Sequence, residues 1–386
     1  MVLEQGKARN RVKNASSTFA KMILQLFCIS LSFSLSLSLT LAAPDLLVVA
    51  QDGLGDFSSI MDAVNAVPDY SPNRTTIKIK AGIYNEFVFV SKEKLNLMFI
   101  GEGVDSTRVI GNKSNIEGIR ISESATLAIE GDGFLAQDIT IENTAGPEAR
   151  QAVAVQISSD YSAFYRCRIV GFQDTLYTKA GIQFFRDCEI YGTVDFIFGH
   201  ARVVLQHCNI YGRQPIQGQA ITVTAQNRNS LEISGIVIQS SIITATVELQ
   251  NSLFPVKVYL GRPWSNYSTT VIMHNYLDTF IDPVGWLDWD NRSALDTIKY
   301  IEYANQGPGA DTSRRVSWKG FEVPNNLVYA AQFTAREFID GASWIPSTGF
   351  PCDLDLGPTS SLGADLIPSF WLLLLGVFLY IVQQMW

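Results

Sequence analysis

Two aspartates occupy the same position of a repeated sequence motif. The first copy reads Cys167-Arg-Ile-Val-Gly-Phe-Gln-Asp174, and the second, about 21 residues later, reads Cys188-Glu-Ile-Tyr-Gly-Thr-Val-Asp195. β-prone repeats of this length are typical of a solenoid, in which each coil stacks on the previous one. Because adjacent strands lie about 4.8 Å apart, Asp174 and Asp195 should face each other across one step of the stack. The motif therefore predicts a paired-carboxylate site.

Such a pair could divide the work of acid and nucleophile. Two carboxylates at one strand spacing cannot both ionise at low cost, so one should hold a proton while the other stays charged. The alternative is an aspartate ladder that only accepts hydrogen bonds in turns. The neighbouring residues favour the chemical interpretation.

Two glutamines and an arginine are expected beside the pair. Gln173 directly precedes Asp174, and Gln151 lies near the same phase of the preceding coil. Side-chain amides donate hydrogen bonds without charge, so two of them beside a nucleophile can stabilise an oxyanion. Arg262 could hold Asp195 ionised through a bidentate contact.

Aromatic residues near these positions suggest a groove for sugar rings, whose faces are apolar. The candidates for substrate binding are Tyr177, Phe198, Trp264 and Trp286. About half of the aromatic residues in this region are expected to belong to the core instead.

The surrounding sequence predicts the scaffold. From Leu46 to about Leu356, short β-branched or aromatic runs alternate with Gly, Asn and Asp turns, and long amphipathic helices are scarce. The fold class is therefore all-β, a single-stranded right-handed parallel β-helix of roughly ten coils, its hand following from strand twist. A short helix between Phe57 and Val67 should cap the N-terminal end of the stack.

The composition suits one large folded domain with terminal extensions. The chain has 386 residues, 47% hydrophobic and 17% charged, with a net charge of −8. This acidic balance argues against nucleic acid as a partner. Residues 1–43, basic and then apolar, are expected to be a signal peptide or an uncleaved signal anchor.

The predicted catalytic domain spans residues 44–356. Residues 357–386 form an apolar tail that is a lipid-anchor signal, a short membrane span or a misread frame. Four sequons support the secretory route, at Asn73, Asn112, Asn266 and Asn291.

Three cysteines share one phase of the repeat. Cys167, Cys188 and Cys208 should form a column in which at most one disulfide can close, and a stack of small buried residues is favoured over a bond. His200, His207 and His274 lack the close pairing of a zinc site, so no metal is expected.

At this point the sequence resembles the plant pectin methylesterases. The resemblance covers about Leu46 to Leu356 and is carried by five stretches in the family's order, Gly82-Ile-Tyr-Asn-Glu86, Gln151-Ala-Val-Ala-Val155, Gln173-Asp-Thr-Leu-Tyr177, Gly192-Thr-Val-Asp-Phe-Ile-Phe-Gly199 and Leu260-Gly-Arg-Pro-Trp264. It implies a right-handed parallel β-helix and hydrolysis of homogalacturonan methyl esters to acidic pectin and methanol, in modification of the cell wall.

The resemblance also implies a role for each matched residue. Asp195 is the expected nucleophile, Asp174 the acid and then base, Gln151 and Gln173 the oxyanion donors, and Arg262 the group that positions Asp195. Trp264 would line the substrate groove. No cofactor is required. The expected partner is homogalacturonan, and a proteinaceous inhibitor is left open as a second one. The protein should be a secreted monomer.

Two features depart from the family pattern. Val155-Gln156 stands where the family usually has Leu or Phe followed by a basic or variable residue, which should tune the groove. The 43-residue leader is too short for the helical inhibitor-like pro-region of many plant members, so the form without that region is expected.

Three rival functions fit the sequence less well. A serine esterase would need a Gly-x-Ser-x-Gly elbow, which the sequence lacks. A pectin-active glycosidase or lyase could share the fold, but an inverting carboxylate pair needs about 6.5 to 9.5 Å, more than one strand step. A wall-binding protein without activity is disfavoured by the complete set of candidate catalytic residues.

Overall fold

The computed structural model describes residues 46–289 and 294–356 of the chain. Within this part, strands dominate and form three parallel sheets, here called A, B and C. The predicted leader, the apolar tail and the sequon at Asn291 lie outside the described residues. The sequons at Asn73, Asn112 and Asn266 are exposed.

Sheet A has eleven strands, which in spatial order are β1 (Leu46–Val49), β2 (Thr75–Ile79), β5 (Leu97–Ile100), β8 (Leu135–Gln137), β11 (Ser162–Tyr165), β14 (Ile182–Arg186), β17 (Arg202–Gln206), β20 (Gly235–Gln239), β23 (Thr269–Met273), β25 (Lys299–Tyr303) and β26 (Phe321–Glu322). Sheet B has eight, β3 (Gly82–Asn85), β6 (Thr107–Gly111), β9 (Thr140–Asn143), β12 (Arg168–Val170), β15 (Glu189–Gly192), β18 (Asn209–Gly212), β21 (Ile242–Ala245) and β24 (Tyr276–Leu277). Sheet C has seven, β4 (Val88–Val90), β7 (Leu127–Ile129), β10 (Val155–Ser158), β13 (Leu176–Ala180), β16 (Ile197–Gly199), β19 (Ile221–Gln226) and β22 (Val258–Gly261).

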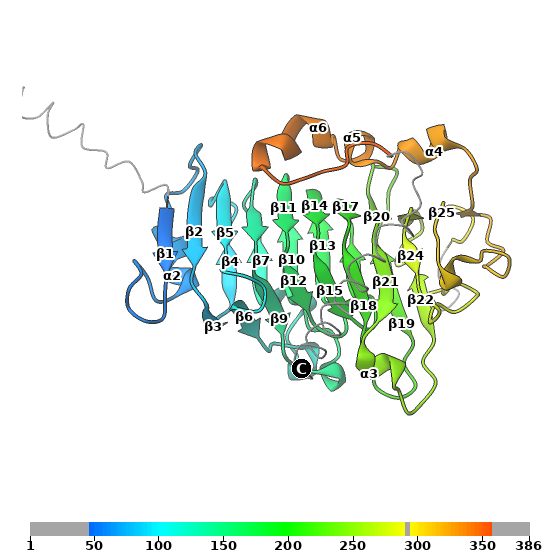
Figure 1. Ribbon diagram of the computed structural model, residues 1–386, viewed down its shortest axis with the longest axis horizontal. Helices are drawn as coiled ribbons and strands as arrows, with labels where there is room; N and C mark the ends of the chain where they lie inside the picture. Colours follow the sequence, from blue (N-terminus) through cyan, green and yellow to red (C-terminus); the bar gives the residue numbers. More distant parts are fainter. Residues whose placement is uncertain (1–45, 290–293, 357–386) are drawn as a thin grey trace, which may run out of the picture. The chain divides into compact units, whose positions relative to one another are not determined.

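The strands follow one another around a solenoid. From β2 to β24 the chain passes from sheet A to sheet B to sheet C and returns to A one step further along, so each strand pairs in parallel with its counterpart in the next coil. Figure 1 shows these strands stacked side by side in sequence order. The predicted right-handed parallel β-helix is confirmed.

The predicted capping helix is confirmed as α2 (Ile60–Ala66). Ile60, Ala63 and Val64 are buried against the first coils. Ser59 is the N-cap residue, and the carboxylate of Glu86 accepts from the Ile60 and Met61 amides at 3.1 and 3.0 Å. An acidic group at a helix N-terminus satisfies free amides and interacts favourably with the helix dipole.

The core runs the length of the solenoid. Side chains from the inward positions of all three sheets form one continuous cluster, in which Cys167, Cys188 and Cys208 are fully buried. These thiols occupy equal positions of successive coils and are free, as is Cys352. The prediction of a buried cysteine stack is therefore confirmed.

Short helices cover part of sheet A. They are α4 (Leu327–Ala331), α5 (Ala335–Phe338) and α6 (Gly341–Trp344), drawn above the strands in Figure 1. Their buried residues Phe338 and Trp344 pack with Phe184 and Val237 of the sheet. Helices of four or five residues carry too little periodicity to be predicted from sequence, so these three were not expected.

The remaining helical segments lie in loops. They are α3 (Val247–Gln250) and five 3₁₀ turns, η1 (Asn115–Glu117), η2 (Ile121–Glu123), η3 (Pro147–Ala149), η4 (Pro308–Ala310) and η5 (Ile345–Thr348). Of the helices in residues 46–289 and 294–356, each is too short to cross a membrane.

Candidate active site

The two aspartates lie in neighbouring turns between sheets B and C. Asp174 precedes β13 and Asp195 precedes β16, and these strands pair in register. Both residues have positive φ, 64° and 52°, a conformation that aspartate tolerates better than most residues. The Asp174 amide donates to Val194 O at 3.0 Å, which joins the two turns. The predicted juxtaposition is confirmed.

Asp195 is held by three side-chain hydrogen bonds. The Arg262 guanidinium donates through Nε to Oδ1 at 2.8 Å and through Nη2 to Oδ2 at 2.6 Å. Thr222 Oγ1 donates to Oδ1 at 2.6 Å and accepts from the Asp195 amide at 2.8 Å. A bidentate guanidinium contact favours the charged carboxylate and fixes its plane. The predicted contact between Arg262 and Asp195 is therefore present.

Asp174 has the opposite environment. It is 5% exposed, and none of the described residues donates a hydrogen bond to its carboxyl group. Burial, and then the negative charge of Asp195, raise the pKa of Asp174 well above its usual value, while Arg262 opposes the shift. Asp174 is thus the member of the pair that holds a proton more readily.

The two glutamines lie where the sequence placed them. Gln151 and Gln173 both line the cleft that contains the aspartates, and the Ala152 amide donates to Gln173 O at 3.1 Å, so the two residues belong to adjacent coils. Within the described residues, neither side-chain amide nitrogen donates a hydrogen bond. Both donors therefore remain available to a group that enters the cleft.

Aromatic side chains form part of the cleft, which has a volume of about 170 Å³. Phe198 lines it, and its ring stacks on Tyr177 with centroids 4.3 Å apart. Trp264 also lines it, 6.0 Å from Phe198. Tyr177 supports the cleft from the next strand.

The prediction that Trp286 lines the substrate groove is wrong. Trp286 is 1% exposed, its Nε1 donates to Glu302 Oε1 at 3.1 Å, and its ring packs against Tyr300 in the core. Its backbone forms a bridge with Gly261, which turns the side chain inward. In this segment the tryptophan that lines the cleft is Trp289, three residues further along.

Three residues that form or support the site were not predicted from the sequence. Trp289 stacks under Arg262, with the guanidinium carbon 3.9 Å from the ring centroid. Thr222 binds Asp195 from the next coil, but a long loop before β19 obscures the repeat that would have revealed it. Trp289 carried no pattern that distinguished it from its buried neighbour.

Arg213 is the third missed residue. It follows Gly212 in the third motif copy, the position held by Phe172 in the first copy. Its Nη1 donates to Gly171 O at 2.8 Å, and its guanidinium carbon lies 3.8 Å from the Phe172 ring centroid. Arg213 therefore braces the turn that carries Gln173 and Asp174.

Gln156 and the three histidines lie outside the catalytic group. Gln156 is buried in register with Tyr177, in the row that continues to Phe198, so it lies beside the aromatic part of the cleft. His200, His207 and His274 do not line the cleft. His200 and His207 contact carboxylates, and burial lowers the pKa of His274.

This arrangement is suited to acyl transfer. It combines an oriented, charge-paired carboxylate, a buried carboxyl group with a raised pKa and two amide donors in one cleft. A nucleophile, an acid and an oxyanion site are the elements that ester hydrolysis through a covalent intermediate requires.

Comparison with known proteins agrees with this chemistry. The family model for pectinesterase matches residues 46–342. A pectinesterase of Daucus carota is 51% identical over 312 residues, which cover 80% of this chain and 97% of that protein. A putative pectinesterase/pectinesterase inhibitor of Arabidopsis thaliana is 50% identical, covering 80% of this chain and 65% of that protein. The chain spans somewhat less than two thirds of the length of several such relatives.

Solved structures are similar as well. The carrot pectin methylesterase has a TM-score of 0.80 at 49% identity and covers 83% of this chain and 100% of its own. The enzyme from Aspergillus niger has a TM-score of 0.68 at 30% identity, covering 79% of this chain and 96% of its own. The chain belongs to the pectinesterase family.

Proposed function

We propose that this protein is a pectin methylesterase, a carboxylic ester hydrolase that converts methyl-esterified homogalacturonan to acidic pectin and methanol. One observation carries the proposal. Asp195 is paired with Arg262 through two hydrogen bonds, while the carboxyl group of the adjacent buried Asp174 has no hydrogen-bond donor among the described residues. The family membership and the likeness to the carrot enzyme support the same activity.

In the first half of the reaction, a carboxylate oxygen of Asp195 attacks the ester carbonyl carbon. Arg262 and Thr222 orient the carboxylate and keep it ionised. The negative charge that develops on the carbonyl oxygen is stabilised by the amide groups of Gln151 and Gln173. Asp174 donates its proton to the leaving methoxy oxygen, and methanol departs from an acyl-aspartyl intermediate.

In the second half, Asp174 acts as a base. Having lost its proton, it accepts one from a water molecule, and the resulting hydroxide attacks the acyl carbon. Collapse of this second tetrahedral intermediate frees the galacturonate carboxyl group and regenerates the Asp195 carboxylate. Asp174 ends the cycle protonated, as it began, so the two aspartates need no further proton carrier.

The substrate polymer would lie across the cleft against the half-buried ring of Trp264, with the buried Phe198 and its stacking partner Tyr177 supporting the cleft wall. A partly exposed aromatic ring can bind the apolar face of a pyranose. Secretion to the cell wall follows from the substrate and is supported by exposed sequons. We also propose a monomer that can bind a proteinaceous inhibitor. At the N-terminus the leader is cleaved after residue 43 or kept as a membrane anchor, and the apolar C-terminal tail is a second candidate for membrane attachment.

Methanol release from highly methyl-esterified pectin tests the function. The purified protein should release methanol without producing new reducing or unsaturated ends, and Asp195→Ala should abolish release while the protein stays folded. New chain ends without methanol would replace the proposal with a glycosidase or a lyase. Neither product from a folded protein, with pectin binding retained, would indicate an inactive wall-binding protein.

A further inference from the structure

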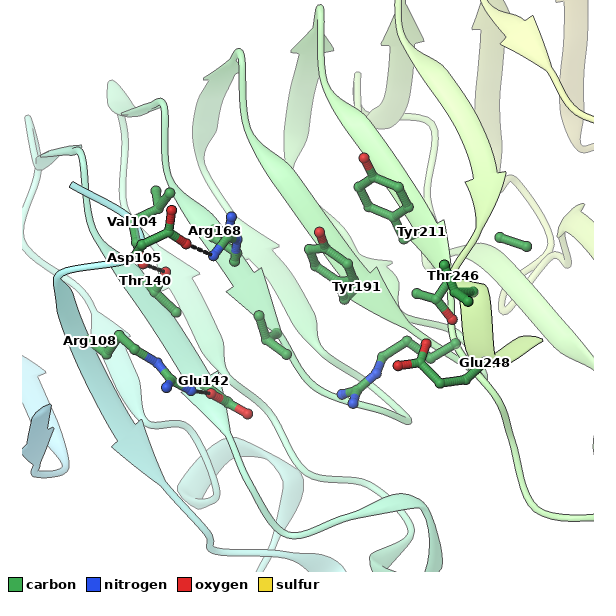
Figure 2. A pocket seen from close by; sticks show the side chains of 14 residues that line it. Val104, Asp105, Arg108, Thr140, Glu142, Arg168, Tyr191, Tyr211, Thr246 and Glu248 are labelled. Carbon is green, nitrogen blue, oxygen red and sulfur yellow. Dashed lines mark hydrogen bonds and ion pairs between the residues drawn. The ribbon is translucent and has the colours of Figure 1, made fainter. Parts of the chain in front are cut away.

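A second and larger hollow lies on the outer side of sheet B. Its volume is about 650 Å³, and it shares no lining residue with the catalytic cleft. Figure 2 shows Val104 and Asp105 at one end, Thr246 and Glu248 at the other, and Tyr191 and Tyr211 on neighbouring strands between them. We call this hollow the sheet B groove.

Two stacked tyrosines stand in the groove. Tyr191 and Tyr211 are paired in register on β15 and β18, their ring centroids are 4.6 Å apart, and their planes differ by 14°. Each ring covers one face of the other. The register partner of Tyr191 on the opposite side is Val170, a short side chain that also lines the groove. Val170 is too short to cover the whole outer face of the Tyr191 ring, which is partly exposed and lines the groove, so a flat apolar ligand face can pack on the remainder.

The polar walls already carry paired charges. Arg108 is bonded to Glu142, and Arg168 Nη1 donates to Asp105 Oδ1 at 2.6 Å. Arg168 Nε also donates to Glu189 Oε2 at 2.5 Å, and the Tyr191 hydroxyl donates to the same oxygen at 3.1 Å. A guanidinium has five N–H donors and a carboxylate accepts at several lone pairs, so these lining residues keep hydrogen-bonding capacity beyond the bonds they make. Such alternating donors and acceptors match the hydroxyl groups of a sugar.

The sum of charges around the groove selects the kind of sugar. The charged lining residues are three arginines and three carboxylates, Arg108, Arg168, Arg213, Asp105, Glu142 and Glu248. The charges of these six residues cancel, and Glu189, which is bonded to Arg168 and Tyr191, adds a negative charge beside them. An anionic ligand would therefore meet no net attraction and would lose hydration on entry. An uncharged ring loses less.

We propose that the sheet B groove is a second carbohydrate-binding site for an uncharged pyranose stretch of a polysaccharide. One ring packs on the exposed face of Tyr191, and the paired arginines and carboxylates bind its hydroxyl groups. The identity of the polymer rests on the proposed function, because methyl-esterified galacturonan is uncharged whereas its product is anionic. The groove then retains the unprocessed polymer and releases the processed one.

Affinity electrophoresis tests this binding apart from catalysis. The Asp195→Asn protein is run through gels that contain highly methyl-esterified galacturonan, de-esterified galacturonan or no polymer. Adding Tyr191→Ala and Tyr211→Ala should weaken retention by the esterified polymer about tenfold, the factor expected when one apolar ring face is no longer buried. Tyr211→Phe should keep the retention, and Tyr276→Ala, an exposed tyrosine of the same sheet outside the groove, should not change it.

Val247→Arg provides a second route if the double variant fails to fold. Val247 is 69% exposed at the groove rim, so this change obstructs the groove without touching the core, and it should also weaken retention. Unchanged retention in a folded variant would overturn the proposal. So would tyrosine-dependent retention by the de-esterified polymer that is equal to or stronger than that by the esterified one.

Turnover separates this proposal from the proposed function. With Asp195 intact, the two tyrosine changes should leave kcat/KM for short esterified oligomers unchanged and lower it for the polymer. Absence of methanol release from any substrate would refute the esterase function. Tyrosine-dependent binding of the esterified polymer in that case would still support the groove.

Discussion

Two arginine–carboxylate pairs in this solenoid have nearly the same geometry and different surroundings. In the cleft, Arg262 contacts Asp195 at 2.8 and 2.6 Å, and their side chains are 20% and 8% exposed. In the core, Arg315 contacts Glu302 at 2.7 and 3.1 Å, and their side chains are 2% and 1% exposed. Both are bidentate.

The difference lies in what each carboxylate has beside it. Glu302 also accepts from Trp286, and Arg315 donates to Gly309 O and Pro283 O, so the protein satisfies this pair from several sides. Asp195 instead lies next to the buried Asp174, whose carboxyl group accepts no hydrogen bond from any described residue and whose pKa is raised by burial and by the Asp195 charge more than Arg262 lowers it. The core pair contributes to folding, whereas the cleft pair leaves one unsatisfied acid in position for chemistry.

The largest effect is expected from removing the charge of the cleft carboxylate. Asp195→Asn should lower kcat for methanol release by about 10⁴-fold or more, because the amide cannot act as the nucleophile. Its free energy of unfolding should change by no more than about 1 kcal/mol. Steady-state kinetics and urea unfolding measure the two effects. Retention of more than a hundredth of the activity would show that Asp195 is not the nucleophile.

Breaking the core pair should produce the reverse pattern. Arg315→Met leaves the Glu302 charge buried without its partner, which should cost about 3–5 kcal/mol of stability. The folded fraction should keep the parent kcat, because neither residue lines the cleft. Urea unfolding at constant pH measures the loss. A stable variant with reduced kcat would mean that this pair supports the active site and not the core.

A smaller loss of activity is expected when Arg262 is replaced by lysine, which keeps the positive charge but cannot form two parallel hydrogen bonds. Arg262→Lys removes the bidentate contact with Asp195 and the stacking on Trp289. We expect kcat to fall about 100-fold with a smaller change in KM, because a single ammonium group cannot fix the carboxylate plane. An unchanged kcat would show that a positive charge beside Asp195 is sufficient and that the bidentate geometry is not required.

The sequence predicted the cleft much better than the core pair, and repeat phase explains why. Asp174, Asp195 and Gln173 lie in or beside motif copies of nearly constant length, so their positions could be aligned without a structure. Trp286 and Trp289 follow long loops, where the phase is lost, and no local pattern showed which indole turns inward.

Contacts between distant coils were equally hidden from the sequence. Arg315 and Glu302 meet because of how the last coils pack, and nothing in their spacing indicates an ion pair. Arg213 was visible only as the place where the third motif copy loses its aspartate. Its reach back to Phe172 depends on side-chain length and direction, which a strand pattern does not encode.

The raised pKa of Asp174 should make the stability of the protein depend on pH. The folded state holds this proton at pH values where an unfolded aspartate, with a pKa of about 3.9, has lost it, so stability falls as pH rises through the folded pKa. Asp174→Asn removes this cost. The variant should therefore gain stability relative to the parent as pH rises above about 4, by more than 1 kcal/mol once the parent Asp174 is charged.

Urea unfolding at a series of pH values measures this gap, the difference in free energy of unfolding between Asp174→Asn and the parent. The gap should close at low pH, where both forms of the parent carry the proton. As a control, Asp195→Asn removes the neighbouring charge and should weaken the pH dependence that belongs to Asp174. A gap between Asp174→Asn and the parent that does not change with pH would mean that Asp174 has no raised pKa in the folded protein.

The smallest change in activity is expected from replacing a tryptophan of the cleft, Trp264, and the matched control is a tryptophan of the core, Trp286. Trp264→Leu removes a half-buried ring from the cleft and should raise KM for esterified pectin about tenfold, with little change in kcat or stability, because the ring binds substrate and transition state alike. Trp286→Leu is the matched change in the core, where the ring contacts Tyr300 and Glu302. It should lower stability and leave KM unchanged in the folded fraction. If Trp264→Leu lowered kcat at constant KM instead, the ring would act mainly in the transition state, and the cleft aromatics would belong with Asp195 and not with the substrate groove.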